Sequence, residues 1–332
     1  MSFAFNFEDP NSECSVEGSL RVENAHKKDQ ESLSDHGSQT KRKPTVEMKE
    51  FYGEEIVKKL TLKSLEFGDC MLRIVDTSCL EQMVLNDKEL QKLLDTSHVL
   101  QAVCSHSDLV SGSYEGGLKI WECAFDLTEF LSTKLQGLSL GIKDKSVLEL
   151  GCGAGLPALF CLKSGAKQVH FQDYNEEVLK LLTCVNVRLS TENTDLEERC
   201  RYFAGDWSSF SDLSDREKLK YDIILTAETI YNEENYSKLH ALFDAVLKEN
   251  GFILLAAKSY YFGVGGSIEG FLEYVGSMGM FSSETVHTVA KGVPRYILLL
   301  KRMEKNHQEE VPASGPEDNQ TDSSVTTSSN IT

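Results

Sequence analysis

The sequence has no paired cysteine motif. Its nine Cys residues are scattered along 332 residues, and no two of them have the CxxC spacing. An odd number of unpaired cysteines predicts neither a disulfide framework nor a zinc site. We therefore expect reduced thiols in a reducing compartment, and no metal.

The sequence also has no excess of basic residues. Its 34 Lys and Arg stand against 52 Asp and Glu, which gives a net charge of -18. Surfaces that bind nucleic acids or anionic membranes need positive charge, so this composition argues against both as direct partners. The charge fits a basic protein partner. It equally fits acidic tails that only aid solubility, and composition does not choose between these two interpretations.

Long hydrophobic runs are absent as well. No run approaches the roughly 18 to 20 apolar residues that span a membrane. The opening MSFAFNFEDP turns acidic and polar before an apolar stretch of signal-peptide length can form. We expect a soluble intracellular monomer.

Composition divides the chain into four parts. Residues 1–47 are rich in Ser, Glu, Asp and Lys, which predicts a disordered N-terminal arm. Residues 48–104 mix alternating and helical spacings and predict a small lead-in subdomain. Residues 105–303 form the main domain, and residues 304–332 form a Ser/Thr-rich disordered tail. Within the arm, KRKP at residues 41–44 is either a nuclear import signal or a chance basic cluster.

From Ser146 onward, short apolar runs alternate with helical stretches. The runs are SVLEL, QVHFQ, RYFAG, YDIILT, GFILLAA and PRYILLL, with a weaker strand near 283–289; the predicted helices are 157–164, 175–189, 233–247 and 267–276. This alternation predicts an α/β fold with a Rossmann-like, seven-stranded, mostly parallel sheet. Too few residues join the last two strands for a parallel crossover, so we expect an antiparallel hairpin at one edge.

Glycines and acids follow the strands of this predicted sheet. Ligands of open α/β sheets bind at the carboxyl ends of the strands. The candidate residues there are Glu149, Gly151, Gly153, Gly155, Gln172, Asp173, Tyr174, Gly205, Asp206, Trp207, Thr226, Glu228 and Tyr231.

The glycine spacing and the acids indicate the ligand. GxGxG at 151–155 differs from the dinucleotide fingerprint GxGxxG. Glu149, Asp173 and Asp206 would surround the ligand with carboxylates, which suits positive charge and hydrogen-bond donors rather than phosphate. S-adenosylmethionine offers an ammonium, ribose hydroxyls, an adenine amine and a sulfonium. We therefore predict this cofactor, with Glu149 near its ammonium and Asp173 on its ribose.

Each of these features also has a structural interpretation. The glycines could form a plain turn, Asp173 a helix N-cap, and Asp206 with Trp207 a turn beside a packed aromatic. Their joint occurrence at three successive strand ends favours a binding site.

A second cluster precedes the first predicted strand of the sheet. The flexible pair Gly116-Gly117 leads into a helical pattern that begins at Leu118. This segment is either a lid over the cofactor or an amphipathic helix buried on the sheet. As a lid it would contact the cofactor through Ile120, Trp121, Glu122 and Cys123.

Five motifs resemble the histidine protein methyltransferases, a branch of the seven-β-strand methyltransferases. They are SDLVSGSYEGGLKIWEC (107–123), VLELGCGAG (147–155), FQDYN (171–175), LTAETIYN (225–232) and AKSYYFGVGG (257–266). The resemblance covers roughly residues 105–301. It implies S-adenosylmethionine as donor, a histidine of a ribosomal large-subunit protein as acceptor, and a location in the cytosol and nucleus, including the nucleolus. The tail after Lys301 departs from the family pattern.

The resemblance also implies a catalytic pair. Related protein methyltransferases carry an acidic residue followed three positions later by an aromatic, which Glu228 and Tyr231 match. A carboxylate that accepts one imidazole N–H fixes the tautomer and exposes the other nitrogen. Tyr231 either bounds the acceptor pocket or is only a packed aromatic side chain.

Two alternatives remain open from the sequence. A protein-lysine methyltransferase would use the same acid and aromatic for an ammonium, and a non-catalytic S-adenosylmethionine-binding protein would act through its tails. An adenine or glutamine methyltransferase would usually carry [DN]PP[YF] where this chain has Thr226-Ala227-Glu228-Thr229.

Overall fold

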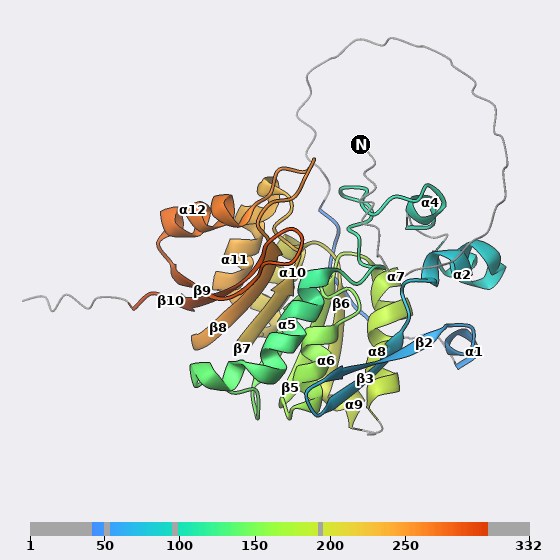
Figure 1. The fold of residues 1–332 in the computed structure, drawn as a ribbon, viewed down its shortest axis with the longest axis horizontal. Coiled ribbons are helices and arrows are strands. Elements are labelled where there is room, and N and C mark those ends of the chain that lie inside the picture. Colours follow the sequence, from blue (N-terminus) through green and yellow to red (C-terminus); the bar gives the residue numbers. More distant parts are fainter. Residues whose placement is uncertain (1–41, 50–53, 95–98, 192–194, 305–332) are drawn as a thin grey trace, which may run out of the picture.

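The centre of the molecule is an eight-stranded sheet with helices on both faces (Figure 1). The computed structural model describes residues 42–49, 54–94, 99–191 and 195–304. The parallel strands are β4 (Ser146–Leu150), β5 (Gln168–Asp173), β6 (Cys200–Ala204), β7 (Tyr221–Ala227) and β8 (Leu247–Lys258), and the full order is β1-β6-β5-β4-β7-β8-β10-β9. The predicted Rossmann-like, mostly parallel sheet is confirmed.

The predicted edge hairpin is also confirmed. Strands β9 (Phe281–Val289) and β10 (Arg295–Arg302) pair antiparallel, and β10 lies between β8 and β9. The short connection between them allows only this antiparallel arrangement.

An eighth strand enters from the region assigned to the N-terminal arm. Strand β1 (Val46–Glu47) pairs antiparallel with β6. The preceding residues cross tightly over Gly205, whose φ is +144° and where a Cβ would lie 2.7 Å from the carbonyl oxygen of Pro44. Only glycine allows this close approach.

Side chains of the strands alternate between two hydrophobic cores, as a pleated sheet requires. Val147, Ile223 and Leu254 belong to one core and Leu148, Ile224 and Leu255 to the other. The first core is covered by α5 (Glu122–Thr133), α6 (Leu156–Lys163) and α8 (Cys184–Ser190), and the second by α10 (Trp207–Glu217), α11 (Tyr236–Val246) and α12 (Ile268–Met278).

The predicted helices are present with small shifts in their ends. The stretch predicted over 175–189 consists of α7 (Glu176–Val178), a π-helical turn η2 (Leu179–Thr183) and α8, while η3 (Glu233–Asn235) leads into α11. Short elements η1 (Leu135–Leu138) and α9 (Leu196–Arg199) complete this part of the chain.

Helix α10 was not predicted from the sequence. Its segment WSSFSDLSDRE is mostly polar, so its apolar spacing is weak. Asp206 caps it, because its carboxylate accepts a hydrogen bond from the backbone N–H of Ser208 at 2.8 Å. Asp206 and Trp207, which the sequence assigned to the cofactor site with a plain turn as the alternative, thus stand at the start of a helix.

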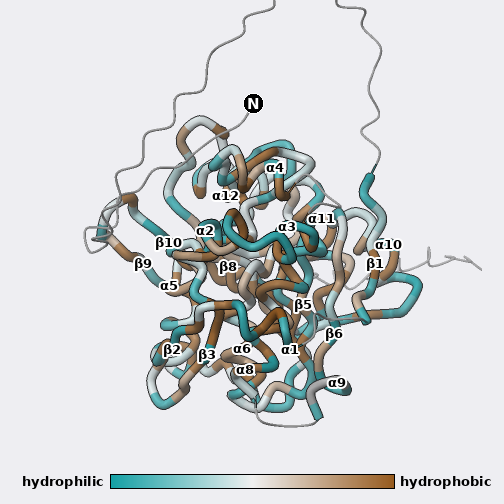
Figure 2. Tube along the Cα trace, turned by 90° about the vertical axis from the view of Figure 1, so that its right-hand side faces the viewer, coloured by the Kyte–Doolittle hydropathy of each residue, from teal (hydrophilic) through white to brown (hydrophobic). Residues whose placement is uncertain are grey.

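The region before the sheet packs onto the first core. It contains α1 (Glu54–Val57), β2 (Leu62–Phe67), β3 (Cys70–Val75), α2 (Leu80–Asn86), α3 (Lys88–Leu94) and α4 (Val99–Cys104). The apolar stretches of β3 and α6 lie side by side (Figure 2). Among the described residues, no helix combines the length and the apolar character needed to cross a membrane.

Candidate active site

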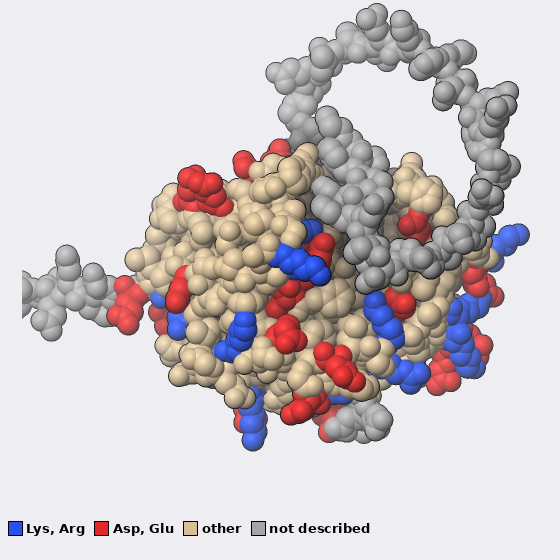
Figure 3. Space-filling view, viewed as in Figure 1, with Lys and Arg blue, Asp and Glu red and all other residues tan. Residues whose placement is uncertain are grey.

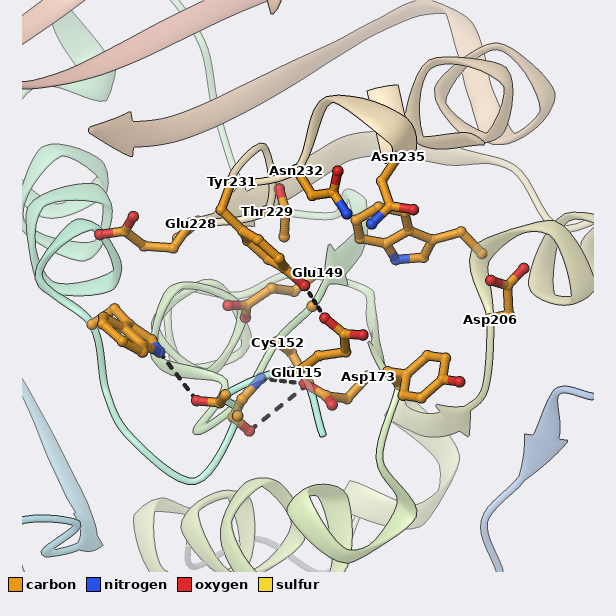
Figure 4. A pocket seen from close by; sticks show the side chains of 18 of the residues that line it. Glu115, Glu149, Cys152, Asp173, Asp206, Glu228, Thr229, Tyr231, Asn232 and Asn235 are labelled. Carbon is orange, nitrogen blue, oxygen red and sulfur yellow. Dashed lines mark hydrogen bonds between the residues drawn. The ribbon is translucent and has the colours of Figure 1, made fainter. Parts of the chain in front are cut away.

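A cavity of about 540 Å³ opens at the carboxyl ends of the parallel strands. It lies where the strand order reverses, because β4 has β5 on one side and β7 on the other. Thirteen of the predicted site residues line it: Ile120, Trp121, Glu149, Gly151, Gly153, Gly155, Asp173, Tyr174, Gly205, Asp206, Trp207, Glu228 and Tyr231. In Figure 4, Glu228 and Asp206 lie at opposite ends, with Tyr231, Glu149 and Asp173 between them.

The glycine loop between β4 and α6 forms the floor of the cavity. Gly153 has a φ of +51°, and a Cβ there would lie 3.3 Å from the carbonyl oxygen of Gly117. Its backbone N–H donates a hydrogen bond to Asp173 Oδ2 at 2.9 Å. The loop therefore meets the Gly116-Gly117 segment backbone to backbone.

Two carboxylates beside this loop are deeply buried. Glu149 accepts a hydrogen bond from the N–H of Ala158 in α6 at 2.9 Å, and burial raises its pKa to about 8. Asp173 accepts bonds from the N–H groups of Gly153 and Asn175, and burial raises its pKa to about 6. Since a carboxylate has about four acceptor positions, both retain capacity for a ligand. Their raised pKa values favour a ligand that brings positive charge or donors.

The opposite end of the cavity is built by the residues that follow β5 and β6. Asp206 lies 3.4 Å from Lys238 Nζ. Trp207 Nε1 donates to Gln172 Oε1 at 2.9 Å, and Gln172 Nε2 donates to the carbonyl of Gly205 at 2.8 Å. Gln172 is therefore fully buried beneath the cavity and supports its wall rather than lining it.

The N-terminal segment contributes to this end too. Arg42 and Lys43 line the cavity. Lys43 Nζ donates to the carbonyl of Tyr174 at 2.8 Å and lies 4.6 Å from the centre of its ring. The sequence did not indicate these residues as part of the site, because nothing local links a basic cluster near residue 42 to a strand end near residue 174.

Only part of the segment predicted as a lid lines the cavity. Ile120 and Trp121 line the cavity, and Trp121 Nε1 donates to the carbonyl of Gly116 at 3.1 Å. Glu122 and Cys123, the first two residues of α5, do not line it, although Ala124 of the same helix does. Glu122 Oε2 lies 3.0 Å from Lys258 Nζ, and Cys123 is fully buried.

Glu228 follows β7 in an unusual conformation. Its φ is +58°, its side chain is 7% exposed, and neither carboxylate oxygen has a hydrogen bond of good geometry within the described residues. Lys258 Nζ lies 3.4 Å from its Oε1. A strained backbone and an unsatisfied buried carboxylate together indicate a functional residue.

Of the two predicted site residues near Glu228, Thr226 is buried away from the cavity and Tyr231 lines it. Thr226 is fully buried and its hydroxyl donates to the carbonyl of Leu150 at 3.0 Å, so it lies outside the cavity. Tyr231 donates its hydroxyl to Glu115 Oε2 (Figure 4). Glu115 was not singled out from the sequence, although it stands in the motif SYEGG before the glycine pair.

A smaller cavity of about 60 Å³ adjoins the first. The two share Glu115, Gly116, Trp121, Glu228 and Tyr231. The rest of its lining is mainly apolar and aromatic: Asp108, Leu109, Lys258, Tyr260, Tyr261, Phe262, Val264 and Val293. Glu228 therefore stands between a large polar cavity and a small aromatic one. Within the described ranges, no cluster of three or more His, Cys, Asp or Glu could hold a metal ion.

Comparison with known proteins shows that this chain is similar to protein methyltransferases. A family model described as "Lysine methyltransferase" matches residues 109–262. The chain is 44% identical over 223 residues to the histidine protein methyltransferase 1 homolog of Bos taurus, covering 60% of this chain and 59% of that protein. It is 40% identical over 206 residues to the homolog of Dictyostelium discoideum, covering 62% and 60%. The resemblance predicted from the motifs is confirmed.

The match to these relatives is partial. The chain spans about three fifths of the length of the curated relatives it matches. A protein-lysine N-methyltransferase of Chaetomium thermophilum is 45% identical over only 76 residues, 23% of this chain and 21% of that protein. Among solved structures, a TehB-like SAM-dependent methyltransferase of Corynebacterium glutamicum has a TM-score of 0.39 at 16% identity, covering 51% of this chain and 86% of that one.

Proposed function

We propose that this chain is an S-adenosylmethionine-dependent protein-histidine N-methyltransferase. The observation that carries the proposal is Glu228, a buried carboxylate without a hydrogen bond of good geometry in the described part of the chain. It lies between a cavity of about 540 Å³ and an aromatic chamber of about 60 Å³. A donor in the first cavity and an acceptor side chain in the second would meet beside it.

The larger cavity fits the cofactor that the methyltransferase relatives imply. Its volume falls within the roughly 300 to 1,000 Å³ typical of small-molecule sites. Glu149 lies beside the glycine loop, where the ammonium of the methionine part would bind. Asp173 ends β5 and Tyr174 follows it, and there they would hold the ribose. The methionine part is thereby assigned to the glycine loop, and the adenosine part extends from there toward the turns after β5 and β6.

The cofactor supplies an electrophilic methyl group on a sulfonium. The chain's own residues must position the acceptor nitrogen in line with it, about 3 to 3.5 Å away, and exclude water. Glu228 accepts the N–H of one imidazole nitrogen, which leaves the lone pair of the other nitrogen free to attack. As the N–C bond forms and the C–S bond breaks, the ring becomes cationic. The Glu228 carboxylate stabilises that charge and can take the proton.

We further propose a basic protein as substrate, specifically a ribosomal large-subunit protein, in the cytosol and nucleus. Resemblance to the histidine protein methyltransferases and the net charge of -18 support this. Lys and Arg side chains on the face shown in Figure 3 are interspersed with Asp and Glu rather than gathered into one patch. We therefore propose no direct nucleic-acid contact.

A lysine acceptor is the second candidate, since the matching family model carries that description and a buried carboxylate also suits an ammonium. The two acceptors differ in their dependence on pH. Imidazole is neutral above its usual pKa of about 6.5, whereas a lysine amine with a pKa near 10.4 must first lose a proton. A lysine reaction should therefore accelerate steeply in alkali.

Glu228→Gln tests the orienting role. Gln keeps the shape but offers a weaker, neutral acceptor, so single-turnover methyl transfer should fall by about a hundredfold or more. Affinity for S-adenosylhomocysteine should stay within a few fold, because Glu228 acts on the acceptor side. The rates are measured from about pH 7 to 9.5 with saturating donor, a cell extract as acceptor and mass-spectrometric mapping of the methylated residue.

Glu269→Gln is the matched control, because Glu269 is exposed on α12 and does not line either cavity. It should behave like the wild type. A Glu228→Gln variant as fast as the wild type would refute the orienting role. A steep rise with pH, with label on lysine, would instead support the second candidate.

A further inference from the structure

Lys258 lines the smaller cavity, where the acceptor would bind. Methyl transfer to an imidazole does not require a lysine at this position. Lys258 is the last residue of β8, with 7% of its side chain exposed. Its ammonium lies 3.0 Å from Glu122 Oε2 and 3.4 Å from Glu228 Oε1. It also lies 5.1 Å from the centre of the Trp121 ring. A buried cation therefore occupies the place where two carboxylates and an indole converge.

These surroundings are those that a protein would offer to a substrate ammonium. Two carboxylates and an aromatic face bind a positively charged amine well. Because Lys258 already holds them, a second ammonium entering the chamber would meet a like charge within a few ångströms. A neutral imidazole would not meet this repulsion, and it could still donate its N–H to Glu228 Oε2, the oxygen that Lys258 does not pair with.

We propose that Lys258 determines acceptor selectivity. Its ammonium pairs with the carboxylates of Glu122 and Glu228, so the smaller cavity admits a neutral imidazole and excludes a lysine ammonium. This inference rests on the proposed histidine methyltransferase function and identifies what excludes the second candidate. Lys258 acts through Glu228 and through repulsion. It is a specificity-determining residue and takes no part in the bond-making step.

The charged state of Lys258 is supported by the groups around it. Burial alone lowers the pKa of Lys258, but the nearby charges of Glu228 and Glu122 outweigh burial and raise it. The other titratable groups facing this region are Asp108, Glu115, Tyr231 and Tyr260 of the smaller cavity, Cys123 and Asp126 of α5, Tyr261 of the loop after β8, and Arg295 of β10. Burial and the Glu228 charge raise the pKa values of Cys123 and Tyr261, so both stay neutral. Arg295 is paired with Asp126.

The test compares Lys258→Gln with Lys258→Arg, which keeps the charge. Lys301→Gln serves as a matched control on an exposed position of β10. Each protein is incubated with isotopically labelled S-adenosylmethionine and a cell extract, and methylhistidine and methyllysine are quantified by mass spectrometry after hydrolysis. Calorimetry with S-adenosylhomocysteine checks that each variant is folded and binds the cofactor product.

We expect the ratio of methyllysine to methylhistidine to rise at least about tenfold in Lys258→Gln, since a like charge within about 4 Å opposes an ammonium by more than that factor. The gained lysine activity should increase from pH 7 to 9.5, while Lys258→Arg and Lys301→Gln keep the wild-type ratio. An unchanged ratio in Lys258→Gln, or lost histidine label without gained lysine label, would overturn the inference. A wild type that labels no histidine would instead contradict the proposed function.

Discussion

At the scale of single residues, this site is defined by carboxylates that the fold keeps from water. Glu149 and Asp173 have relative exposures of 2% and 4%. Burial disfavours the charged form and raises the pKa of each. Glu149, with a pKa of about 8 in the folded chain against about 4.3 when exposed, binds its proton more tightly when folded. Its contribution to stability is therefore full below about pH 4 and is lost as the pH rises toward 8.

Glu149 should make cofactor binding dependent on pH. An ammonium placed beside it would lower its pKa and release a proton near pH 7, so affinity for S-adenosylhomocysteine should rise between about pH 6.5 and 8. Calorimetry in two buffers of different ionisation enthalpy measures the released protons. In Glu149→Gln, whose amide oxygen can still accept from Ala158 N–H, the release should disappear. Equal proton release in both proteins would show that Glu149 does not face the ammonium.

At the scale of elements, the segment that leads into β1 acts as a strap over one end of the site. The carbonyl of Lys43 accepts from the N–H of Asp206 at 3.2 Å, and its ammonium bonds the carbonyl of Tyr174 at 2.8 Å. The strap thus joins the turns after β5 and β6, at the part of the cavity proposed for the adenosine of the cofactor. The rest of the predicted arm, residues 1–41, and the predicted tail from residue 305 lie outside the described residues.

Lys43→Ala should weaken binding of S-adenosylhomocysteine by about three- to tenfold, because it removes a charge-assisted hydrogen bond and a cation–π contact that hold Tyr174. Thermal stability should change little, since the β1–β6 pairing remains. Lys49→Ala, an exposed lysine beyond the same strand, should match the wild type. Titration calorimetry on the three proteins measures the effect, and equal affinities would remove the strap from the binding site.

At the scale of the whole molecule, the antiparallel hairpin formed by β2 and β3 shares one hydrophobic core with the eight-stranded sheet. Leu72 and Ile74 of β3 belong to the same cluster as Val147 of β4 and Leu159 of α6. Asn186 of α8 connects them: the N–H of Val75 donates to its Oδ1 at 2.8 Å, and its Nδ2 donates to the carbonyl of Ala154 at 2.9 Å. The glycine loop is therefore tied to the hairpin through one buried side chain.

Asn186→Leu should lower the free energy of unfolding by about 2 to 5 kcal/mol, because it leaves two buried backbone groups without partners. Denaturant unfolding should remain a single transition if the hairpin and sheet are one cooperative unit. Gln136→Leu, at an exposed position, should cost little by comparison. Loss of the hairpin signal before the sheet signal in the wild type would contradict this coupling.

The sequence by itself determined the features that are local in the chain. Short apolar runs followed by Glu149, Gly151, Asp173 and Asp206 predicted both the parallel sheet and the position of a site at its edge. This succeeds because strand alternation and the residues at strand ends are set by neighbouring positions. The helix α10 was missed because its sequence is mostly polar and has few apolar residues at helical spacing. Its N-cap, Asp206, is a local signal but was not sufficient by itself.

Only the tertiary structure decided which distant segments meet. It brought Lys43 onto Tyr174, Glu115 onto Tyr231, and Lys258 between Glu122 and Glu228. It also placed Gln172 and Thr226 beneath the cavity instead of in its lining. Such contacts depend on strand order and helix packing, which no spacing within one segment encodes. Whether a carboxylate caps a helix, pairs with a lysine or faces a ligand is decided by those long-range neighbours.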